Sequence, residues 1–164
     1  MRRLKVWVLI PLLWLGACKN HDSRIKTEKI KTGKISIKNL EKYDWYGAEY
    51  NRFVPKQALL DSLKGINNYS ILIFGGDWCS DTKFYLPQFV KLLNTLNFPK
   101  EHLSIYFLDR TKQCANCGEV PPEKYKVTRV PTFIILDKSG NEKGRITETP
   151  SKSLEEDLVR MELY

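Results

Sequence analysis

A near-continuous apolar run, residues 69–75, restricts the fold of this chain most, because it leads directly into a cysteine and then into a helical pattern. Runs of this kind are typical of strands that are buried on both faces of a sheet. Trp78 and Cys79 follow the run, and apolar residues then recur at helical spacing over 81–96, with Pro87 among them. The pattern therefore predicts a strand, a tight turn and a helix that begins at the cysteine.

The position of Cys79 indicates a reactive thiol. Unpaired backbone N–H groups and the helix dipole at a helix N-terminus favour a thiolate, which is the nucleophilic form of cysteine. Asp81 opposes this by charge repulsion, while it favours the helix start itself. A dithiol exchange site has the pattern Cys-x-x-Cys, and here the fourth position is Thr82. A small buried cysteine without chemistry is the alternative interpretation.

The remaining pattern predicts one compact domain over residues 43–164. Further strands are expected at 103–108, 132–136 and 142–146, together with a helix that starts at Pro55 and a last helix capped by Ser153 and Glu156. Long connections suit parallel strands, whereas a short turn suits an antiparallel pair. Both kinds of connection are present, so we expect an α/β fold with a mixed sheet.

The first residues have the composition of an export leader. Three basic residues precede an apolar stretch, 6–15, that is too short to span a membrane comfortably, since a transmembrane helix needs about 20 residues. The stretch ends in Leu15-Gly16-Ala17-Cys18, which resembles a bacterial lipobox. The resemblance implies that residues 1–17 are removed and that Cys18 is lipidated. An ordinary signal peptide or an uncleaved anchor is the alternative.

Charge divides the rest of the chain into a basic tether, 18–42, and a neutral domain. The tether has eight Lys and Arg against three Asp and Glu, whereas residues 43–164 have sixteen of each. We expect a solvated spacer that holds the domain off the bilayer, with binding to lipid headgroups or anionic polymers as the alternative. Nucleic-acid binding is not expected of an exported chain with a neutral domain. Lys19, rather than an aspartate, follows the lipidated cysteine and favours the outer membrane, facing the periplasm.

Two motifs together resemble the thioredoxin fold across residues 43–164. They are Trp78-Cys79 at the start of a proline-containing helix and Val130-Pro131-Thr132 before a hairpin. The resemblance implies a mixed central sheet with flanking helices and a cis bond before Pro131, which would lie beside Cys79. More closely, the chain is similar to exported thioredoxin-family proteins with a Trp-Cys-Gly-Asp-Ser type of motif, in which Ser80 and Thr82 stand here in the Gly and Ser positions. The implied site residues are Cys79, Trp78, Pro131, Asp81 and Thr82.

The implied activity is thiol–disulfide exchange through Cys79 on protein or peptide thiols and disulfides. A non-catalytic module of the same fold, which binds peptides or proteins at its Pro131 edge, is the alternative. In the implied fold, Cys114 and Cys117 follow the strand 103–108 at the same edge of the sheet as Cys79. Their loop either supplies the resolving thiol that the motif lacks, or is stiffened by a local Cys114–Cys117 disulfide.

Other ligands and ion pairs complete the expectations. A structural zinc site needs four ligands, and Cys114 and Cys117 supply two. The only other soft candidates in the domain are His102 and Cys79, so a zinc site would need both of them, and we expect none. We also expect no cofactor. Structural ion pairs are expected within Asp109-Arg110 and between Arg145 and Glu148, with substrate positioning by Asp109-Arg110 as the alternative.

Overall fold

The computed structural model describes residues 31–163. The predicted leader, 1–17, and the predicted lipidation site at Cys18 lie outside the described residues. Within the described range, no helix combines the length and the apolar character needed to cross a membrane.

The centre of the fold is a five-stranded sheet in the order β1-β3-β2-β4-β5, and the sheet is mixed, as the sequence predicted. Its strands are β1 (Gly33–Lys34), β2 (Ser70–Gly75), β3 (Leu103–Phe107), β4 (Thr132–Leu136) and β5 (Glu142–Thr147). The central strand β2 runs parallel to β3 and antiparallel to β4, while β1 and β5 add antiparallel edges. The chain therefore surrounds its most apolar strand with neighbours on both sides.

Alternate side chains of β2 reach two separate cores. Ile71 and Ile73 lie in the larger core, whereas Leu72 and Phe74 lie in the smaller one on the opposite face. Successive strand residues point to opposite faces, so a strand covered on both sides must be apolar throughout. This arrangement accounts for the near-continuous apolar run.

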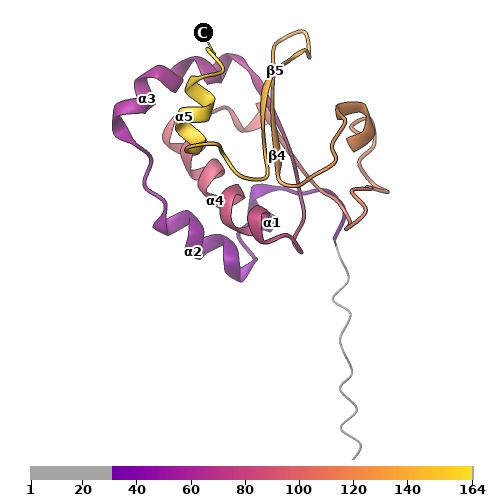
Figure 1. Ribbon diagram of the computed structural model, residues 1–164. Coiled ribbons are helices and arrows are strands. Elements are labelled where there is room, and N and C mark those ends of the chain that lie inside the picture. The colour runs from indigo at the N-terminus through magenta and orange to yellow at the C-terminus, as the bar shows by residue number, and fades with distance from the viewer. Residues whose placement is uncertain (1–30, 164) are drawn as a thin grey trace, which may run out of the picture.

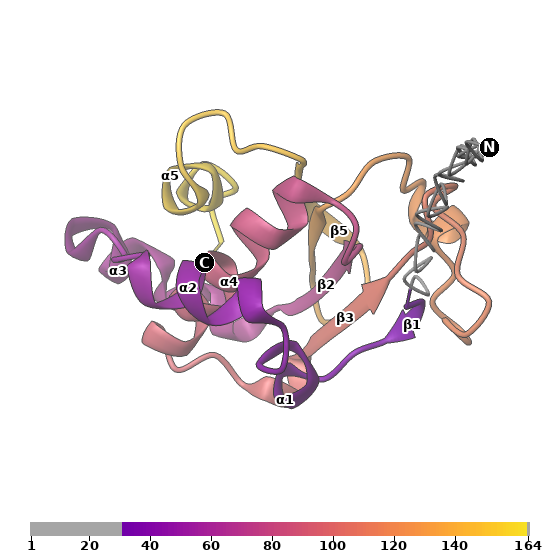
Figure 2. The ribbon, with the colours of Figure 1, turned by 90° about the horizontal axis from the view of Figure 1, so that it is seen from below.

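Helices cover one face of the sheet, and a long connection covers the other (Figures 1 and 2). The helices are α1 (Ile37–Leu40), α2 (Asp44–Arg52), α3 (Gln57–Leu63), α4 (Ser80–Thr95) and α5 (Leu154–Val159), with short 3-10 turns η1 (Lys64–Asn68), η2 (Lys100–His102) and η3 (Pro122–Tyr125). The larger core lies beneath the helices. The smaller core lies beneath the connection between β3 and β4, which contains η3.

The packed part of the chain begins before Tyr43, the predicted start of the domain. Gly33 and Lys34 pair with Phe107 and Tyr106 as an edge strand, within the range 18–42 for which the composition predicts a tether. Leu40 is fully buried in the larger core. The pairing of β1 and the burial of Leu40 therefore attach residues 33–40 to the domain, although the basic composition of this segment resembles that of a linker.

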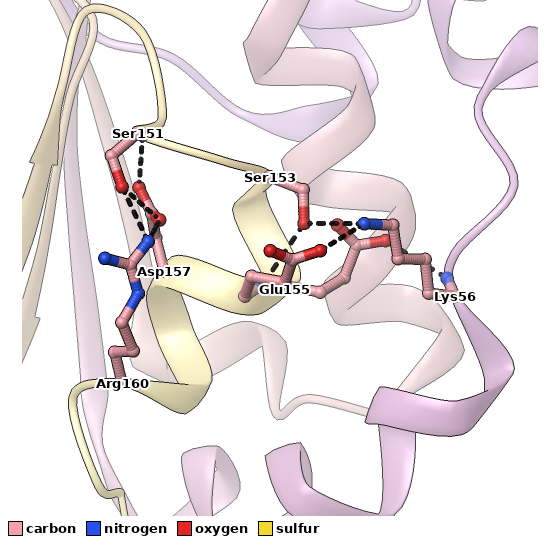
Figure 3. Close-up of polar contacts among 7 residues, drawn as sticks. Lys56, Ser151, Ser153, Glu155, Asp157 and Arg160 are labelled. Atoms are coloured by element: carbon pink, nitrogen blue, oxygen red, sulfur yellow. Dashed lines mark hydrogen bonds and ion pairs between the residues drawn. The ribbon is translucent and has the colours of Figure 1, made fainter.

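Polar contacts join α3 to α5, which are far apart in sequence (Figure 3). The Glu155 carboxylate is only 1% exposed and accepts a hydrogen bond from the Lys56 backbone N–H at 3.1 Å. The Lys56 ammonium in turn contacts Glu156 and, at 3.4 Å, the Ser153 hydroxyl. Ser153 also accepts the Glu156 N–H at 3.2 Å, as the expected helix cap. The last helix is thus attached at its first turn to the start of α3.

We expect Glu155→Ala to lower the free energy of unfolding by about 1–3 kcal/mol, because the Lys56 N–H then loses its acceptor. Glu155→Gln keeps an acceptor oxygen and should recover most of this loss. Urea denaturation followed by circular dichroism measures both, with the exposed Lys152→Ala as the control. Equal stability of the Glu155→Ala variant and the wild type would show that this contact does not stabilise the fold.

Candidate functional site

Cys79 occupies the turn between β2 and α4. It is the N-cap residue of the helix, with an extended backbone, and its N–H donates to the Gly76 carbonyl at 3.0 Å. The side chain is half-buried and the cysteine is free. The first N–H groups of a helix have no partner within the helix, and the Cys79 side chain accepts no hydrogen bond from them. The local geometry therefore agrees with the predicted strand, turn and helix.

Thr82 holds this turn together. Its side chain is fully buried, and its hydroxyl oxygen accepts a hydrogen bond from the Gly76 N–H at 3.2 Å. A Cβ atom on Gly75 would lie 2.8 Å from the Thr82 methyl carbon, so the threonine packs into space that only a glycine leaves open. The residue that stands in the place of a second cysteine is thus a packing residue of the turn.

Trp78 is anchored at the end of β3. Its indole N–H donates to the Leu108 carbonyl at 2.8 Å. A Cβ on Gly76 would lie 2.7 Å from the indole nitrogen, so the ring rests directly on the glycine backbone. Arg110 and Lys112 lie over the ring, 5.1 Å and 5.5 Å from its centroid. Trp78 is therefore fixed beside Cys79 with two positive charges against it.

The structure brings Val130-Pro131 to Cys79. The thiol donates to the Val130 carbonyl, with 3.2 Å between sulfur and oxygen. The Val130–Pro131 peptide bond is cis, and Pro131 is buried. The Pro131 carbonyl accepts a hydrogen bond from the Glu148 N–H at 2.6 Å, which fixes the segment against the end of β5. Cys79, Trp78, Thr82 and Pro131 thus share one end of the sheet.

The two acidic residues near Cys79, Asp81 and Asp109, form separate sets of contacts. Asp81 lies in the first turn of α4, where a negative charge is favoured, and its carboxylate contacts the Ser80 hydroxyl at 3.5 Å. Asp109 accepts bonds from the Thr111 hydroxyl at 2.6 Å and from the backbone of Thr111 and Gln113. The Thr111 hydroxyl and then the Gln113 N–H hold the pKa of the Asp109 carboxyl below its ordinary value. This carboxylate therefore organises its own loop.

Both expected ion pairs are wrong. Asp109 accepts hydrogen bonds from its loop and is not paired with Arg110, whose guanidinium lies over Trp78. Arg145 pairs with Glu142, and Glu148 pairs with Arg129 at 2.9 Å. The loop after β3 and the shape of the hairpin decide these partners. Sequence reasoning also missed the contact of Lys112 with Trp78, for which a basic residue after β3 was the available signal.

Cys114 and Cys117 form a disulfide with each other, with 5.5 Å between their Cα atoms. This is the local alternative of the two that the sequence left open. Cys117 belongs to the smaller core, and both Cys114 and Cys79 pack against that core. Within residues 31–163, no group of three or more His, Cys, Asp and Glu is arranged to hold a metal ion.

A thioredoxin family model matches residues 38–160, which is most of the chain and all of the candidate site. The chain belongs to the thioredoxin family. The match starts at Lys38, within α1, and so agrees with a fold that begins before Tyr43. Among curated proteins, none matches the sequence.

Two solved structures are similar to this thioredoxin-family chain. A protein of unknown function from Pseudomonas aeruginosa is 16% identical, with a TM-score of 0.51, over 77% of this chain and 96% of its own. At this identity the likeness concerns the fold alone. An HIV epitope scaffold is 17% identical, with a TM-score of 0.44, over 73% of this chain and 74% of its own.

We expect Thr82→Val to destabilise the turn by about 1–3 kcal/mol, because the Gly76 N–H loses its acceptor. Hydrogen exchange at the Gly76 amide should accelerate in this variant. Thr82→Ser keeps the hydroxyl and should leave that exchange slow, although it loses a packed methyl group. Unchanged protection of Gly76 in Thr82→Val would contradict the assigned role.

Proposed function

We propose that this thioredoxin-family domain exchanges thiols and disulfides through Cys79. The observation that carries the proposal is a free, half-buried cysteine at the start of α4 that contacts the Val130 carbonyl next to Pro131. Trp78 lies beside it, fixed by its bond to Leu108. A thiol in this place is reachable for a substrate and is held in one orientation, which suits a nucleophile.

The exchange balances in two steps. The Cys79 thiolate attacks one sulfur of a substrate disulfide, forms a mixed disulfide with it and releases the other sulfur as a thiolate. A second substrate thiolate then attacks the bound substrate sulfur, forms a new substrate disulfide and releases Cys79. Protons return to the released thiolates from water. One disulfide enters and one disulfide leaves, so the substrates exchange partners without net reduction.

Thr82 is the reason for this stoichiometry. A second cysteine at that position would let the domain release its substrate by closing a disulfide of its own. The buried threonine forms no such bond, and Cys114 and Cys117 are already joined to each other. Release therefore depends on a thiol that a substrate supplies. The partners of this chemistry are protein or peptide thiols and disulfides.

We also propose that the protein is exported and held at a bacterial membrane through lipid on Cys18, on the periplasmic side of the outer membrane. The lipobox-like Leu15-Gly16-Ala17-Cys18 supports this location. The Cys114–Cys117 disulfide supports it independently, because disulfides persist in oxidising compartments and are rare in the cytosol.

A second candidate is a non-catalytic module that binds peptides or proteins at its Pro131 edge. The observation that favours it is Thr82, since the position that would resolve a mixed disulfide serves packing in this chain. The two candidates differ in one respect that an experiment can measure, which is covalent capture of substrate on Cys79.

We expect Cys79→Ser to abolish mixed-disulfide formation with a disulfide-containing peptide, because the nucleophilic sulfur is removed. Cys114→Ser/Cys117→Ser, which removes only the loop disulfide, should retain both capture and release when a small thiol is added. Mass spectrometry of the intact protein detects each species.

Two results would contradict this account. Absence of capture by the wild type, with any peptide, would favour the binding module. Capture without release by the Cys114→Ser/Cys117→Ser variant, when wild type turns over, would assign the resolving thiol to the loop.

We expect Thr82→Cys to change the stoichiometry from exchange to net reduction. Cysteines three residues apart at a helix start are close enough to bridge, since bridged Cα atoms lie about 4.4–6.8 Å apart. An insulin reduction assay with a dithiol reductant measures the gain, with Thr82→Ser as the matched control. Equal activity of wild type and Thr82→Cys would show that the absence of a second cysteine does not limit the reaction.

A further inference from the structure

Two cationic side chains converge on the indole ring of Trp78, next to Cys79. The Arg110 guanidinium lies 5.1 Å and the Lys112 ammonium 5.5 Å from the ring centroid. Cation–π attraction operates over such distances. The ring is fixed in position, because its N–H donates a hydrogen bond to the Leu108 carbonyl. Both positive charges therefore occupy a defined place beside the proposed nucleophile.

Among the described residues, neither charge forms an ion pair with a carboxylate, and the charge of Lys112 contributes to the lowered pKa of Asp109 only after the hydrogen bonds from Thr111 and Gln113. Within residues 31–163, every arginine other than Arg110 forms an ion pair with Asp or Glu: Arg52, Arg129, Arg145 and Arg160. Lys112 donates to the Arg110 carbonyl at 2.9 Å, and an ammonium has two further donors to offer. Unpaired positive charges of this kind attract anionic groups.

The neighbouring carboxylates have other partners. Asp109 accepts bonds from Thr111 and Gln113 and so keeps the loop that carries both cations in one conformation. Asp81 lies in the first turn of α4, where its carboxylate contacts the Ser80 hydroxyl at 3.5 Å. The cations are thus held in place by the loop while their charge stays available to a ligand.

We propose that Arg110 and Lys112 bind carboxylate groups beside the cysteine of a peptide or protein substrate, so that Cys79 reacts preferentially with cysteines in acidic surroundings. The preference rests on the proposed exchange at Cys79. Trp78 provides an apolar surface for the substrate chain, and the two cations select its charge. Each exposed charge pair contributes modestly, so the selection is graded rather than absolute.

The test uses two peptides that differ only in charge. Each carries one cysteine as a mixed disulfide with neutral thiopyridine, flanked on both sides by Asp in one peptide and by Asn in the other. Attack by Cys79 releases thiopyridone, whose absorbance gives the rate. We expect the Asp peptide to react about three- to tenfold faster in low salt, and this ratio to shrink in about 0.5 M NaCl.

Matched variants locate the effect. Arg110→Gln/Lys112→Gln should remove the preference, so that the ratio of the Asp-peptide rate to the Asn-peptide rate falls to about one, whatever the lost charges do to both rates together. Lys138→Gln/Lys143→Gln removes the same charge near the hairpin at the opposite end of β4, and should keep the preference. Equal rates of wild type with both peptides overturn the proposal and leave the exchange at Cys79 intact. Loss of the preference in the hairpin variant also overturns it, because the effect would then follow net charge.

A binding measurement separates this proposal from the exchange itself. If neither peptide reacts faster with the wild type than with Cys79→Ser, the proposed exchange at Cys79 is wrong. Recognition of the acidic peptide is then measured by binding, with peptides in which serine replaces the cysteine. The Trp78 indole N–H resonance of the Cys79→Ser protein should then shift with the Asp peptide and not with the Asn peptide. No selective shift overturns the proposal. A shift with phosphatidylglycerol vesicles but not with the Asp peptide would assign the cations to lipid headgroups and overturn it as well.

Discussion

The packing of Thr82 against Gly75 and Gly76 is the interaction on which the site depends. The threonine methyl fills the space above Gly75, and its hydroxyl accepts the Gly76 N–H. These contacts bring the first turn of α4 back over the end of β2. Cys79 is consequently held at the helix start, and the Trp78 ring packs closely against Gly76. A larger residue at Gly75 would collide with Thr82 in the first turn of α4, and one at Gly76 would collide with the Trp78 ring.

The central position of β2 explains why distant segments meet at Cys79. Its parallel neighbour β3 ends at the same edge and delivers Leu108, whose carbonyl anchors Trp78. Its antiparallel neighbour β4 begins at that edge, so Val130 and Pro131 arrive from the other side. The Val130 carbonyl then accepts a hydrogen bond from the Cys79 thiol. Two strand ends thus flank the cysteine, and each contributes a backbone carbonyl that orients one residue of the motif.

Local signals explain what could be predicted from the sequence. The apolar run, the helical spacing after Cys79 and the cap at Ser153 all act between near neighbours, and the corresponding β2, α4 and α5 are present. The segment before Tyr43 could not be assigned in this way, because β1 exists only through its pairing with β3. Nor did apolar spacing reveal α2, whose helix carries mainly aromatic and polar residues. Partners such as Arg145 with Glu142 depend on loop shape, which residue types alone do not determine.

The state of the three cysteines in residues 43–164 favours exchange by Cys79 alone over resolution by the loop. The loop sulfurs are already joined, and Cys117 is 5% exposed within the smaller core. A resolving role would first require an external reductant to open that disulfide, and an oxidising compartment would close it again. Exchange through Cys79 requires only the thiol that the structure leaves free. The domain has three cysteines, one more than a single disulfide uses, and this keeps one thiol available at the edge of the sheet.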